Sequence, residues 1–361
     1  MWKLVYMFLS FLTASLSGAA NEKAELLFVG DALQHQAQLD KAIELGNGIY
    51  DYSDCFSLIA PDIKEADYAV VNLEVPLGGG PDYTGYPCFS APDSYAQALK
   101  DAGFDLFLTA NNHCLDRRDV AARRTLDALD SLKVDHTGTF RTRMERDSLV
   151  PLIKDINGFR VAFLNYTYGT NGIPPIDGME VALIDTLQIK KEINLAKELE
   201  AEIIVATMHW GIEYVLLESN VQRKLADFLI DNGVDLIIGS HPHVVQPFKV
   251  VKNEKENKDV LVVYSLGNFI SNMKTADTRG GALVRVTLGR DEFGKARFEK
   301  ADYDLIFAAK PEGDRNFRVI PGWLEEEVPA SQKYHWEIFK RGAKKVFDQY
   351  NVNVEQRDHH N

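Results

Sequence analysis

The chain has 361 residues, of which 45% are hydrophobic and 26% are charged. This composition is that of a globular protein with enough apolar material for a large core. The formal net charge of -13 excludes a general nucleic-acid binder, which needs a basic face, and argues against electrostatic docking on anionic lipid. The three cysteines include no Cys-x-x-Cys pair, so the sequence does not indicate a structural zinc site.

The N-terminus has the pattern of a secretory signal peptide. A short basic start, Met1-Trp2-Lys3, precedes an apolar run over residues 4–16 and the small residues Ser17-Gly18-Ala19-Ala20. The apolar run is too short for a comfortable membrane span. We therefore predict a signal peptide over residues 1–20 and an exported protein, periplasmic or at the cell surface. An uncleaved N-terminal membrane anchor is the alternative.

Apolar runs and helical spacings alternate along the rest of the chain. We expect strands at residues 24–29, 68–75, 104–109, 160–165, 203–208, 234–239 and 260–264, and helices at residues 38–45, 56–64, 92–102, 119–132, 186–200 and 221–232. This alternation indicates an α/β domain. Residues 282–288 and 296–307 alternate polar and apolar side chains, which predicts antiparallel strands added to a sheet, and residues 335–350 predict a final helix.

Side chains able to bind metal or move protons lie at or just after the ends of several apolar runs. They are Asp31, Glu74, Asn112, His113, His209, His241 and His243. Ligands of open α/β sheets gather at the carboxyl ends of the strands. Taken singly, each residue has a simpler interpretation as a turn, a helix cap or a packed histidine. Their recurrence at the same kind of position indicates one common site.

The stretch over residues 234–246 contains a pair of these histidines. Four apolar residues lead into Gly239-Ser240, and His241 and His243 follow at once. On extended backbone, the two side chains of a His-x-His pair point to one face, where a metal ion can contact both. A loop with two exposed histidines is the alternative.

The chemistry of these side chains is consistent with metal-dependent hydrolysis. Carboxylates, an amide oxygen and imidazoles suit zinc, manganese or iron. One carboxylate shared between two ions makes a two-metal site, which lowers the pKa of a bridging water and suits phosphoester hydrolysis. The sequence contains no Gly-x-Ser-x-Gly motif and no Walker A loop. We therefore expect two divalent metal ions (Mn, Zn or Fe) as cofactors.

Six motifs occur in order along the chain. They are Val29-Gly30-Asp31, Asn72-Leu73-Glu74, Ala110-Asn111-Asn112-His113 with Asp116, His209-Trp210-Gly211 with Glu213, Gly239-Ser240-His241-Pro242-His243, and Ser265-Leu266-Gly267-Asn268-Phe269. Together they resemble the CapA family, the bacterial capsule or poly-gamma-glutamate synthesis proteins, which is similar to the calcineurin-like metallophosphoesterases. The resemblance covers about residues 25–272.

The resemblance implies a fold and a domain plan. The fold is α/β, a four-layer α/β/β/α metallophosphoesterase-like sandwich with a two-metal centre between its sheets and with antiparallel strands and a helix added at the C-terminus. The sandwich domain would occupy residues 24–310, and residues 311–361 would form a C-terminal extension.

The resemblance also implies roles for the site residues. Asp31 and His243 would bind the first metal, Glu74 would bridge, and Asn112, His209 and His241 would bind the second metal. His113 resembles a histidine that faces the phosphate and stabilises charge or protonates the leaving oxygen, and Asp116 would orient it. One departure is that Leu33 occupies the place of the histidine in the superfamily's Asp-x-His motif. His35 is the candidate substitute ligand; a surface histidine at a helix start is the alternative.

Four further residues are candidates for substrate binding. Arg117 and Arg118 have guanidinium groups that suit phosphate or carboxylate, although two solvated charges at a helix start would look the same. Tyr166 and Tyr168 belong to an aromatic, glycine-rich loop expected over the mouth of the site, where their rings would contact substrate or pack at the rim.

These observations predict an exported metal-dependent phosphoesterase-like hydrolase that acts in capsule or cell-envelope polymer biosynthesis. The expected partners are an envelope polymer or phosphoester substrate, with or without a membrane-bound capsule synthesis or export complex, and no nucleic acid. Two alternatives stay open: a non-catalytic component of such a complex that binds a polyanionic chain, and a metal-dependent hydrolase of amide bonds in the polymer.

Overall fold

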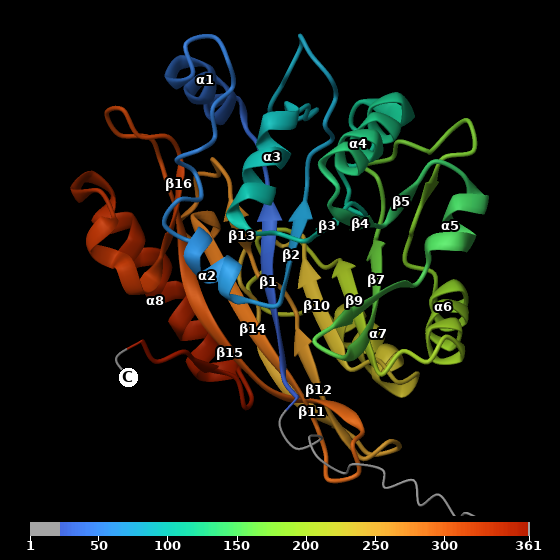
Figure 1. The fold of residues 1–361 in the computed structure, drawn as a ribbon. Coiled ribbons are helices and arrows are strands. Elements are labelled where there is room, and N and C mark those ends of the chain that lie inside the picture. The colour runs from blue at the N-terminus through green and yellow to red at the C-terminus, as the bar shows by residue number, and fades with distance from the viewer. Residues whose placement is uncertain (1–21, 360–361) are drawn as a thin grey trace, which may run out of the picture.

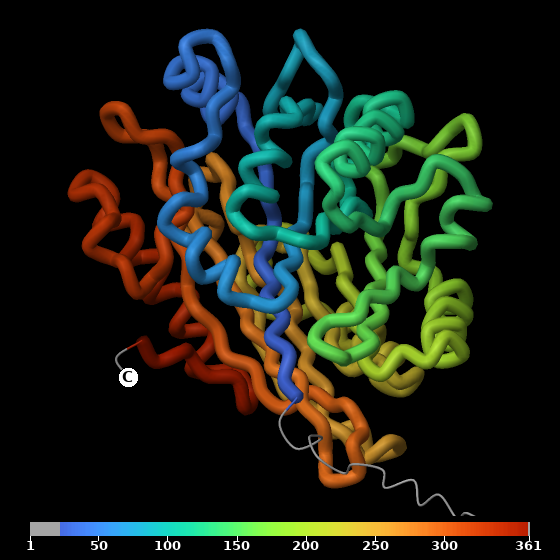
Figure 2. Tube along the Cα trace, in the orientation of Figure 1, coloured from blue at the N-terminus to red at the C-terminus, as the bar shows by residue number. Residues whose placement is uncertain are grey.

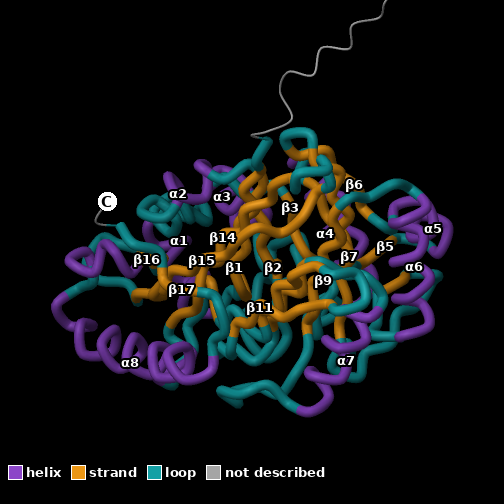
Figure 3. Tube along the Cα trace, turned by 90° about the horizontal axis from the view of Figure 1, so that it is seen from below, coloured by secondary structure: helices purple, strands orange, loops and turns teal. Residues whose placement is uncertain are grey.

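The structure is a computed structural model that describes residues 22–359. The predicted signal peptide over residues 1–20 lies outside the described residues. Within this range, two large sheets pack face to face and helices cover the outer face of each (Figure 1). The view from below shows the strands in the centre, with α2 and α3 on one side and α7 on the other (Figure 3). The four-layer α/β/β/α sandwich is therefore confirmed.

The first sheet has nine strands, in the order β16-β15-β14-β1-β2-β3-β4, with β13 beside β1 and β17 beside β15. Their bounds are β1 Ala24–Ala32, β2 Tyr68–Leu73, β3 Leu106–Leu108, β4 Asp135–Thr137, β13 Asn268–Ile270, β14 Gly280–Arg290, β15 Ala296–Ala309, β16 Arg318–Pro321 and β17 Glu355–Gln356. β1 to β4 run parallel, and β14 and β15 are antiparallel additions, as predicted. Figure 2 shows how the N-terminal β1 runs beside segments from late in the chain.

The second sheet has six strands, in the order β11-β12-β10-β9-β7-β6. Their bounds are β6 Leu152–Ile156, β7 Phe159–Thr167, β9 Ile203–His209, β10 Leu236–Ser240, β11 Phe248–Asn253 and β12 Lys258–Val263; β5 Thr139–Phe140 and β8 Glu180–Val181 pair separately. The parallel register aligns Thr167, His209 and Ser240 across β7, β9 and β10. Equivalent strand ends therefore meet at one edge of this sheet.

Strand alternation explains the layers. In β7, Val161 and Phe163 face the core between the sheets, while Ala162 and Leu164 face the helices. The helices are α1 Gln36–Leu45, α2 Ala60–Glu65, α3 Asp93–Ala102, α4 Arg118–Leu132, α5 Arg143–Leu149, α6 Thr186–Glu198, α7 Asn220–Asp231 and α8 Lys333–Tyr350, with short 3₁₀ turns η1 Ala276–Thr278, η2 Gly322–Glu327 and η3 Ala330–Gln332. In the part of the chain that the structure describes, no helix is both long and apolar enough to cross a bilayer.

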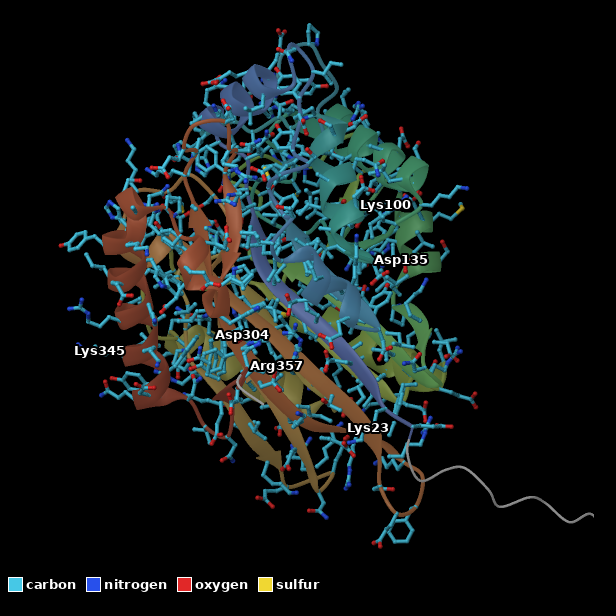
Figure 4. The ribbon with its side chains drawn as sticks, turned by 60° about the vertical axis from the view of Figure 1, so that its left-hand side comes forward. Lys23, Lys100, Asp135, Asp304, Lys345 and Arg357 are labelled. Carbon is cyan, nitrogen blue, oxygen red and sulfur yellow. The ribbon has the colours of Figure 1, made fainter. Side chains whose placement is uncertain are left out.

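The segment after residue 310 packs on the sandwich. β16 pairs with β15, and α8 adds the side chains of Trp336 and Phe347 to the core between the sheets. The chain then returns to the outer face of the first sheet, where the His359 imidazole lies 2.8 Å from the Asp304 carboxylate. Figure 4 shows Asp304 and Arg357 in the same region of this face. These contacts attach the C-terminus to the sheet.

The closest approach of β1 to its neighbours requires a glycine. A Cβ atom on Gly30 would lie 1.9 Å from the carbonyl oxygen of Gly267, the same oxygen that accepts a 3.0 Å hydrogen bond from the Asp31 amide. Because the clash is with backbone, we expect Gly30→Ala to lower the free energy of unfolding in urea by about 3 kcal/mol. Gly169→Ala is the control: its Cβ would meet nothing within 4 Å, and we expect a change below about 0.5 kcal/mol.

Candidate metal centre

The carboxyl ends of β1, β2, β9 and β10 all point toward the top of the view in Figure 1 and lie beneath the helices and loops there. Asp31 lies near the end of β1, Glu74 follows β2, and His209 ends β9. His241 and His243 follow β10 directly. All of these side chains are buried, and Asp31 and Glu74 are fully so.

Glu74 is the most unusual group at this edge. Neither of its carboxylate oxygens has a hydrogen-bond partner, although both are buried. Burial raises the Glu74 pKa well above its usual value, and the Asp31 carboxylate raises it further. A buried carboxylate without a partner is costly unless a cation compensates its charge. Glu74 thus has the surroundings of a metal ligand.

Two groups of metal-ligating atoms share Glu74. Glu74, His241 and His243 form one group and Asp31, Glu74 and His209 the other, with ligand atoms within 4.8 Å of one another in each. Carboxylate oxygens and imidazole nitrogens suit zinc, manganese or iron. These residues therefore fit a pair of divalent cations with Glu74 between them. The resemblance paired His209 with His241 instead, and that partition between the two ions stays a prediction.

Asp31 is held as a carboxylate by three neighbours. It accepts hydrogen bonds from the Asn72 amide (2.7 Å) and the His241 backbone N–H (3.2 Å), and the His243 imidazole lies 3.2 Å away. Burial acts to raise the Asp31 pKa, but the hydrogen bond and charge of His243 outweigh it and hold the pKa at about 2. Asp31 is therefore ionised, as a metal ligand must be.

The imidazoles are oriented by polar side chains behind them. Ser240 Oγ lies 3.0 Å from His209 Nδ1, which leaves His209 Nε2 3.5 Å from Glu74. Asn268 Oδ1 lies 3.0 Å from His243 Nδ1, which leaves His243 Nε2 3.9 Å from Glu74. Such partners fix the tautomer and direction of ligating histidines. The sequence motifs contained Ser240 and Asn268, but spacing alone gave neither a role.

The His-Pro-His turn is not extended, which corrects the conformation expected from sequence. His241 has φ 97° and His243 has φ 58°, both in the left-handed region that non-glycine residues rarely adopt. The turn is held by Tyr214, whose N–H donates to the Pro242 carbonyl oxygen at 2.9 Å. Strained backbone of this kind persists where the surroundings fix it, commonly at functional sites. Here it brings both imidazoles toward Glu74.

His241 also has an unpaired atom. Its Nδ1 is buried without a hydrogen-bond partner, and burial, together with the neighbouring imidazole of His243, lowers its pKa to about 4. Burial and His241 likewise lower the pKa of His209 well below its usual value. The two imidazoles are thus neutral at ordinary pH, which is the form that binds metal.

Asn112, His113 and Asp116 lie in the turns that follow β3. Asn112 Oδ1 is 2.8 Å from His209 Nε2, and its amide donates to Asn171 Oδ1 at 3.2 Å. His113 Nδ1 lies 2.7 Å from Asp116 Oδ2, the same oxygen that accepts a 2.8 Å hydrogen bond from the Phe89 N–H. Asp116 therefore contacts the imidazole of His113 in a geometry that can orient it, and the catalytic roles of the two residues stay predictions.

His35 caps α1 rather than joining the two ligand groups. Its Nδ1 accepts a hydrogen bond from the Asn272 N–H at 3.2 Å and lies 3.3 Å from Gln38 Oε1. Burial, opposed by Gln38 and aided by the charges of His243 and His113, lowers its pKa to about 4. Leu33 packs in the core between the first sheet and its helices. The role of His35 as a ligand stays a prediction.

The four predicted substrate-binding residues have different surroundings. Arg117 donates to the Asp82 carbonyl oxygen at 3.1 Å, and Arg118 is exposed at the start of α4. The Tyr168 ring lies 4.5 Å from that of His241 and is 49% exposed, so it does cover the site. The structure does not bring Tyr166 there. Its hydroxyl donates to Glu192 at 2.5 Å in the core beneath α6, because β7 extends to Thr167 and alternation turns Tyr166 outward.

A comparison with protein families matches residues 25–273 to the family described as Bacterial capsule synthesis protein PGA_cap. The capsule biosynthesis protein CapA of Bacillus anthracis is 30% identical over 278 residues, which cover 74% of this chain and 64% of that protein. The PGA biosynthesis protein CapA of Bacillus subtilis (strain 168) is 26% identical over 334 residues, which cover 89% of this chain and 81% of that protein. The first alignment thus spans less than two thirds of the relative's length.

Two solved structures have a partly similar chain path. The NAD nucleotidase of Haemophilus influenzae has a TM-score of 0.49 and 12% identity, covering 93% of this chain and 57% of that chain. The calcineurin-like phosphoesterase YfkN of Bacillus subtilis has a TM-score of 0.44 and 14% identity, covering 89% of this chain and 99% of that chain.

The fold and the site define an α/β sandwich protein with a cluster of buried carboxylates and histidines able to hold divalent metal at the strand ends. Because the family match covers most of the chain, the protein belongs to the PGA_cap family of bacterial capsule synthesis proteins.

Proposed function

We propose that the protein is an exported, metal-dependent phosphoesterase-like hydrolase that acts in the biosynthesis of a capsule or cell-envelope polymer of the poly-gamma-glutamate type. The observation that carries the proposal is Glu74, a fully buried carboxylate without a hydrogen-bond partner that is shared by two groups of metal-ligating residues. The family supports the polymer, and the N-terminal sequence pattern supports export.

Metal binding and proton donation would be performed by different residues of the chain. When bound, two divalent cations would lower the pKa of a water molecule and polarise the ester. Asp31, Glu74 and the three histidines would hold the ions, and the burial of these side chains keeps bulk water away from them. His113 would act as the general acid. Asp116 contacts its Nδ1, so that the protonated Nε2 is left to donate a proton to the leaving oxygen. The products are an acid and an alcohol.

Metal content and hydrolysis together test this proposal. The mature chain is purified, reconstituted with Mn²⁺ or Zn²⁺, desalted, and measured by elemental analysis and with an aryl phosphate. We expect close to two metal ions per chain and hydrolysis that a chelator abolishes. Fewer than one ion per chain after reconstitution contradicts the two-metal proposal.

Leu33 favours a second candidate, a non-catalytic component that binds the polymer within a synthesis or export complex. The position of the usual first-metal histidine is occupied by Leu33, which packs in the core, and His35 Nδ1 accepts a hydrogen bond from the Asn272 N–H. A single ion per chain, without hydrolysis of phosphoester or amide substrates, would support this candidate over the first.

A further inference from the structure

Four arginine side chains are buried within residues 22–359, and they differ in their partners. They are Arg146, Arg279, Arg285 and Arg318. A carboxylate oxygen lies close to three of them, at 3.0 Å from Arg146, 3.2 Å from Arg285 and 3.9 Å from Arg318. No carboxylate oxygen of the described residues lies within 4.0 Å of Arg279. Arg279 is therefore the buried arginine of the described chain that lacks an ion pair.

The guanidinium group of Arg279 has neutral neighbours. The residue follows η1 directly, precedes β14 and is only 4% exposed. Its Nη2 donates a hydrogen bond to Gln332 Oε1 at 3.0 Å, and its Cζ lies 5.1 Å from the centroid of the Phe307 ring. An amide oxygen and a ring face attract a cation but carry no net charge. The described residues therefore do not neutralise the charge of Arg279.

Arginine cannot avoid the cost of burial by losing its proton. Its pKa is so high that the guanidinium group stays charged in proteins. Burial lowers the pKa of Arg279, and no carboxylate charge opposes this effect. A buried charge without a partner is unfavourable, and pairing with an ion of opposite sign compensates it. Arg279 thus has the surroundings of a group that binds an anion.

Part of the Arg279 guanidinium group is free to bind. Its Nε and Nη1 have no hydrogen-bond partner in the described residues, and neither atom is sealed from solvent, unlike the Nε atoms of Arg146 and Arg285. Because the residue is only 4% exposed, these donors face a narrow opening rather than the open surface. A planar carboxylate that enters the opening can accept hydrogen bonds from the guanidinium group.

Lys310 supplies a second cation next to Arg279. The Gln332 side chain joins the two residues, because the Oε1 atom that binds Arg279 also accepts a 2.8 Å hydrogen bond from the Lys310 N–H. Gln332 Nε2 donates to the Lys310 carbonyl oxygen at 2.9 Å. The Lys310 ammonium group forms no ion pair within the described part of the chain. Two unpaired cations thus lie together in a chain whose formal net charge is -13.

A short series of contacts connects these cations with the metal centre. Thr278 directly precedes Arg279, and its carbonyl oxygen accepts a 3.0 Å hydrogen bond from Asn268 Nδ2. The Oδ1 atom of the same asparagine lies 3.0 Å from His243 Nδ1. An anion bound by Arg279 would therefore lie beside the backbone that supports one of the candidate metal ligands.

We propose that Arg279 and Lys310 form a binding site for a carboxylate group beside the metal centre. The guanidinium group supplies directed hydrogen bonds, and the ammonium group adds positive charge. The assignment of this carboxylate to the substrate rests on the proposed function. A polymer of the poly-gamma-glutamate type carries a carboxylate on every residue, so a segment next to the bond held in the metal centre can occupy the site.

Binding of a γ-linked glutamate tetramer tests the site without requiring metal or catalysis. Its control is the same tetramer with each carboxylate replaced by a carboxamide. The full mature chain is stripped of metal with a chelator and desalted, and each compound is titrated into it in a calorimeter. We expect the tetramer to bind at least about tenfold more tightly than its amide, because charge-assisted hydrogen bonds are lost in the amide.

Two results of these titrations overturn the proposal. One is equal binding of the tetramer and its amide, or no binding of either. The other is binding of inorganic phosphate, titrated in the same way, by a chain that does not bind the tetramer, because the site would then select a tetrahedral anion.

Variants locate the binding at the two cations. Arg279→Gln is expected to weaken binding of the tetramer at least about tenfold, and Lys310→Gln to weaken it severalfold. Arg279→Lys keeps the charge without the planar group, and we expect it to retain part of the affinity. Lys224→Gln removes the same charge from an exposed position on α7 and should leave the affinity unchanged.

Circular dichroism shows whether each variant is folded. Full affinity of a folded Arg279→Gln variant contradicts the role of Arg279. Should that variant fail to fold, the comparison of Lys310→Gln with Lys224→Gln decides, and equal affinity of these two variants contradicts the site.

The outcome is distinguishable from that of the hydrolase proposal. Binding of the tetramer that depends on Arg279, in a protein that holds no metal after reconstitution, supports the carboxylate site and contradicts the hydrolase. Hydrolysis of an aryl phosphate by a chain that does not prefer the tetramer to its amide supports the hydrolase and overturns the carboxylate site.

Discussion

Glu74→Gln is expected to stabilise the metal-free protein and to destabilise the metal-loaded one. In the absence of metal, the Glu74 carboxylate is buried without a partner beside Asp31, and burial and Asp31 both raise its pKa. A neutral amide avoids this charge and can donate to Asp31. We expect a gain of about 2 kcal/mol in the unfolding free energy of the metal-free protein at neutral pH, measured with urea and a chelator.

The stability that the metal-free protein gains from Glu74→Gln depends on pH. The Glu74 pKa is higher in the folded protein than its ordinary value of 4.5, so the folded state binds the proton more tightly than the unfolded state. In the metal-free wild type, Glu74 therefore stabilises the folded state most below about pH 4.5. This stabilisation is lost as the pH rises through the folded pKa. Since glutamine does not titrate, the advantage of Glu74→Gln grows with pH over this range.

In the presence of metal, Glu74→Gln is expected to have the opposite effect on the unfolding free energy. A ligand that binds only the folded state stabilises it by about 4 kcal/mol when present at a thousand times its dissociation constant. Glu74 belongs to both ligand groups, so its loss removes a ligand from each ion. We expect the metal content to fall below one ion per chain and metal to give the variant little added stability.

A second buried glutamate is the control. The Glu192 side chain is also buried, but its carboxylate has two partners. It forms an ion pair with Arg146 at 3.0 Å and accepts a hydrogen bond from the Tyr166 hydroxyl at 2.5 Å. Because this carboxylate has its partners, Glu192→Gln is expected to destabilise the protein both with and without metal. A Glu74→Gln variant that behaves like Glu192→Gln would show that Glu74 is not a metal ligand.

The location of the site was predictable from local sequence. Asp31, His209 and His241 follow apolar runs, and parallel strands bring their carboxyl ends to one edge. This inference needs only the type and direction of each strand. The parallel register of β9 and β10, which pairs His209 with Ser240, is consistent with it.

Features that depend on a single residue of strand length or on tertiary contacts were not predictable. The expected strand over residues 160–165 ends two residues later, and that extension decides that Tyr166 faces α6 rather than the site. The left-handed backbone of His241 and His243 depends on contacts of this turn with Tyr214 and Asp31. Both residues are distant from the turn in sequence. Short strands such as β4 and β13 lack a sequence pattern of their own and form because a neighbouring edge is available.

His113→Ala is expected to reduce hydrolysis without removing metal. His113 is absent from both ligand groups, and Asp116 holds its Nδ1, which suits proton donation from Nε2. Loss of a general acid lowers turnover by roughly a hundredfold to ten-thousandfold. The effect should be large for an alkyl phosphate, whose leaving oxygen needs a proton, and small for p-nitrophenyl phosphate, whose leaving group is stable as an anion.

The difference between the two substrates is what identifies the role of His113. A residue that only supports the fold would lower both rates equally, and a metal ligand would lower the metal content as well. Asp116→Asn is expected to give a smaller loss of rate that is again larger for the alkyl phosphate than for p-nitrophenyl phosphate. The asparagine oxygen still accepts a hydrogen bond from the Phe89 N–H, but it holds the His113 imidazole less firmly than the carboxylate does. His136→Ala removes a comparable histidine–aspartate pair, 2.9 Å from Asp130 and outside both ligand groups, and should leave both rates unchanged. Equal loss on the two substrates for His113→Ala would contradict proton donation, because a leaving group that needs no proton cannot depend on the acid that supplies one.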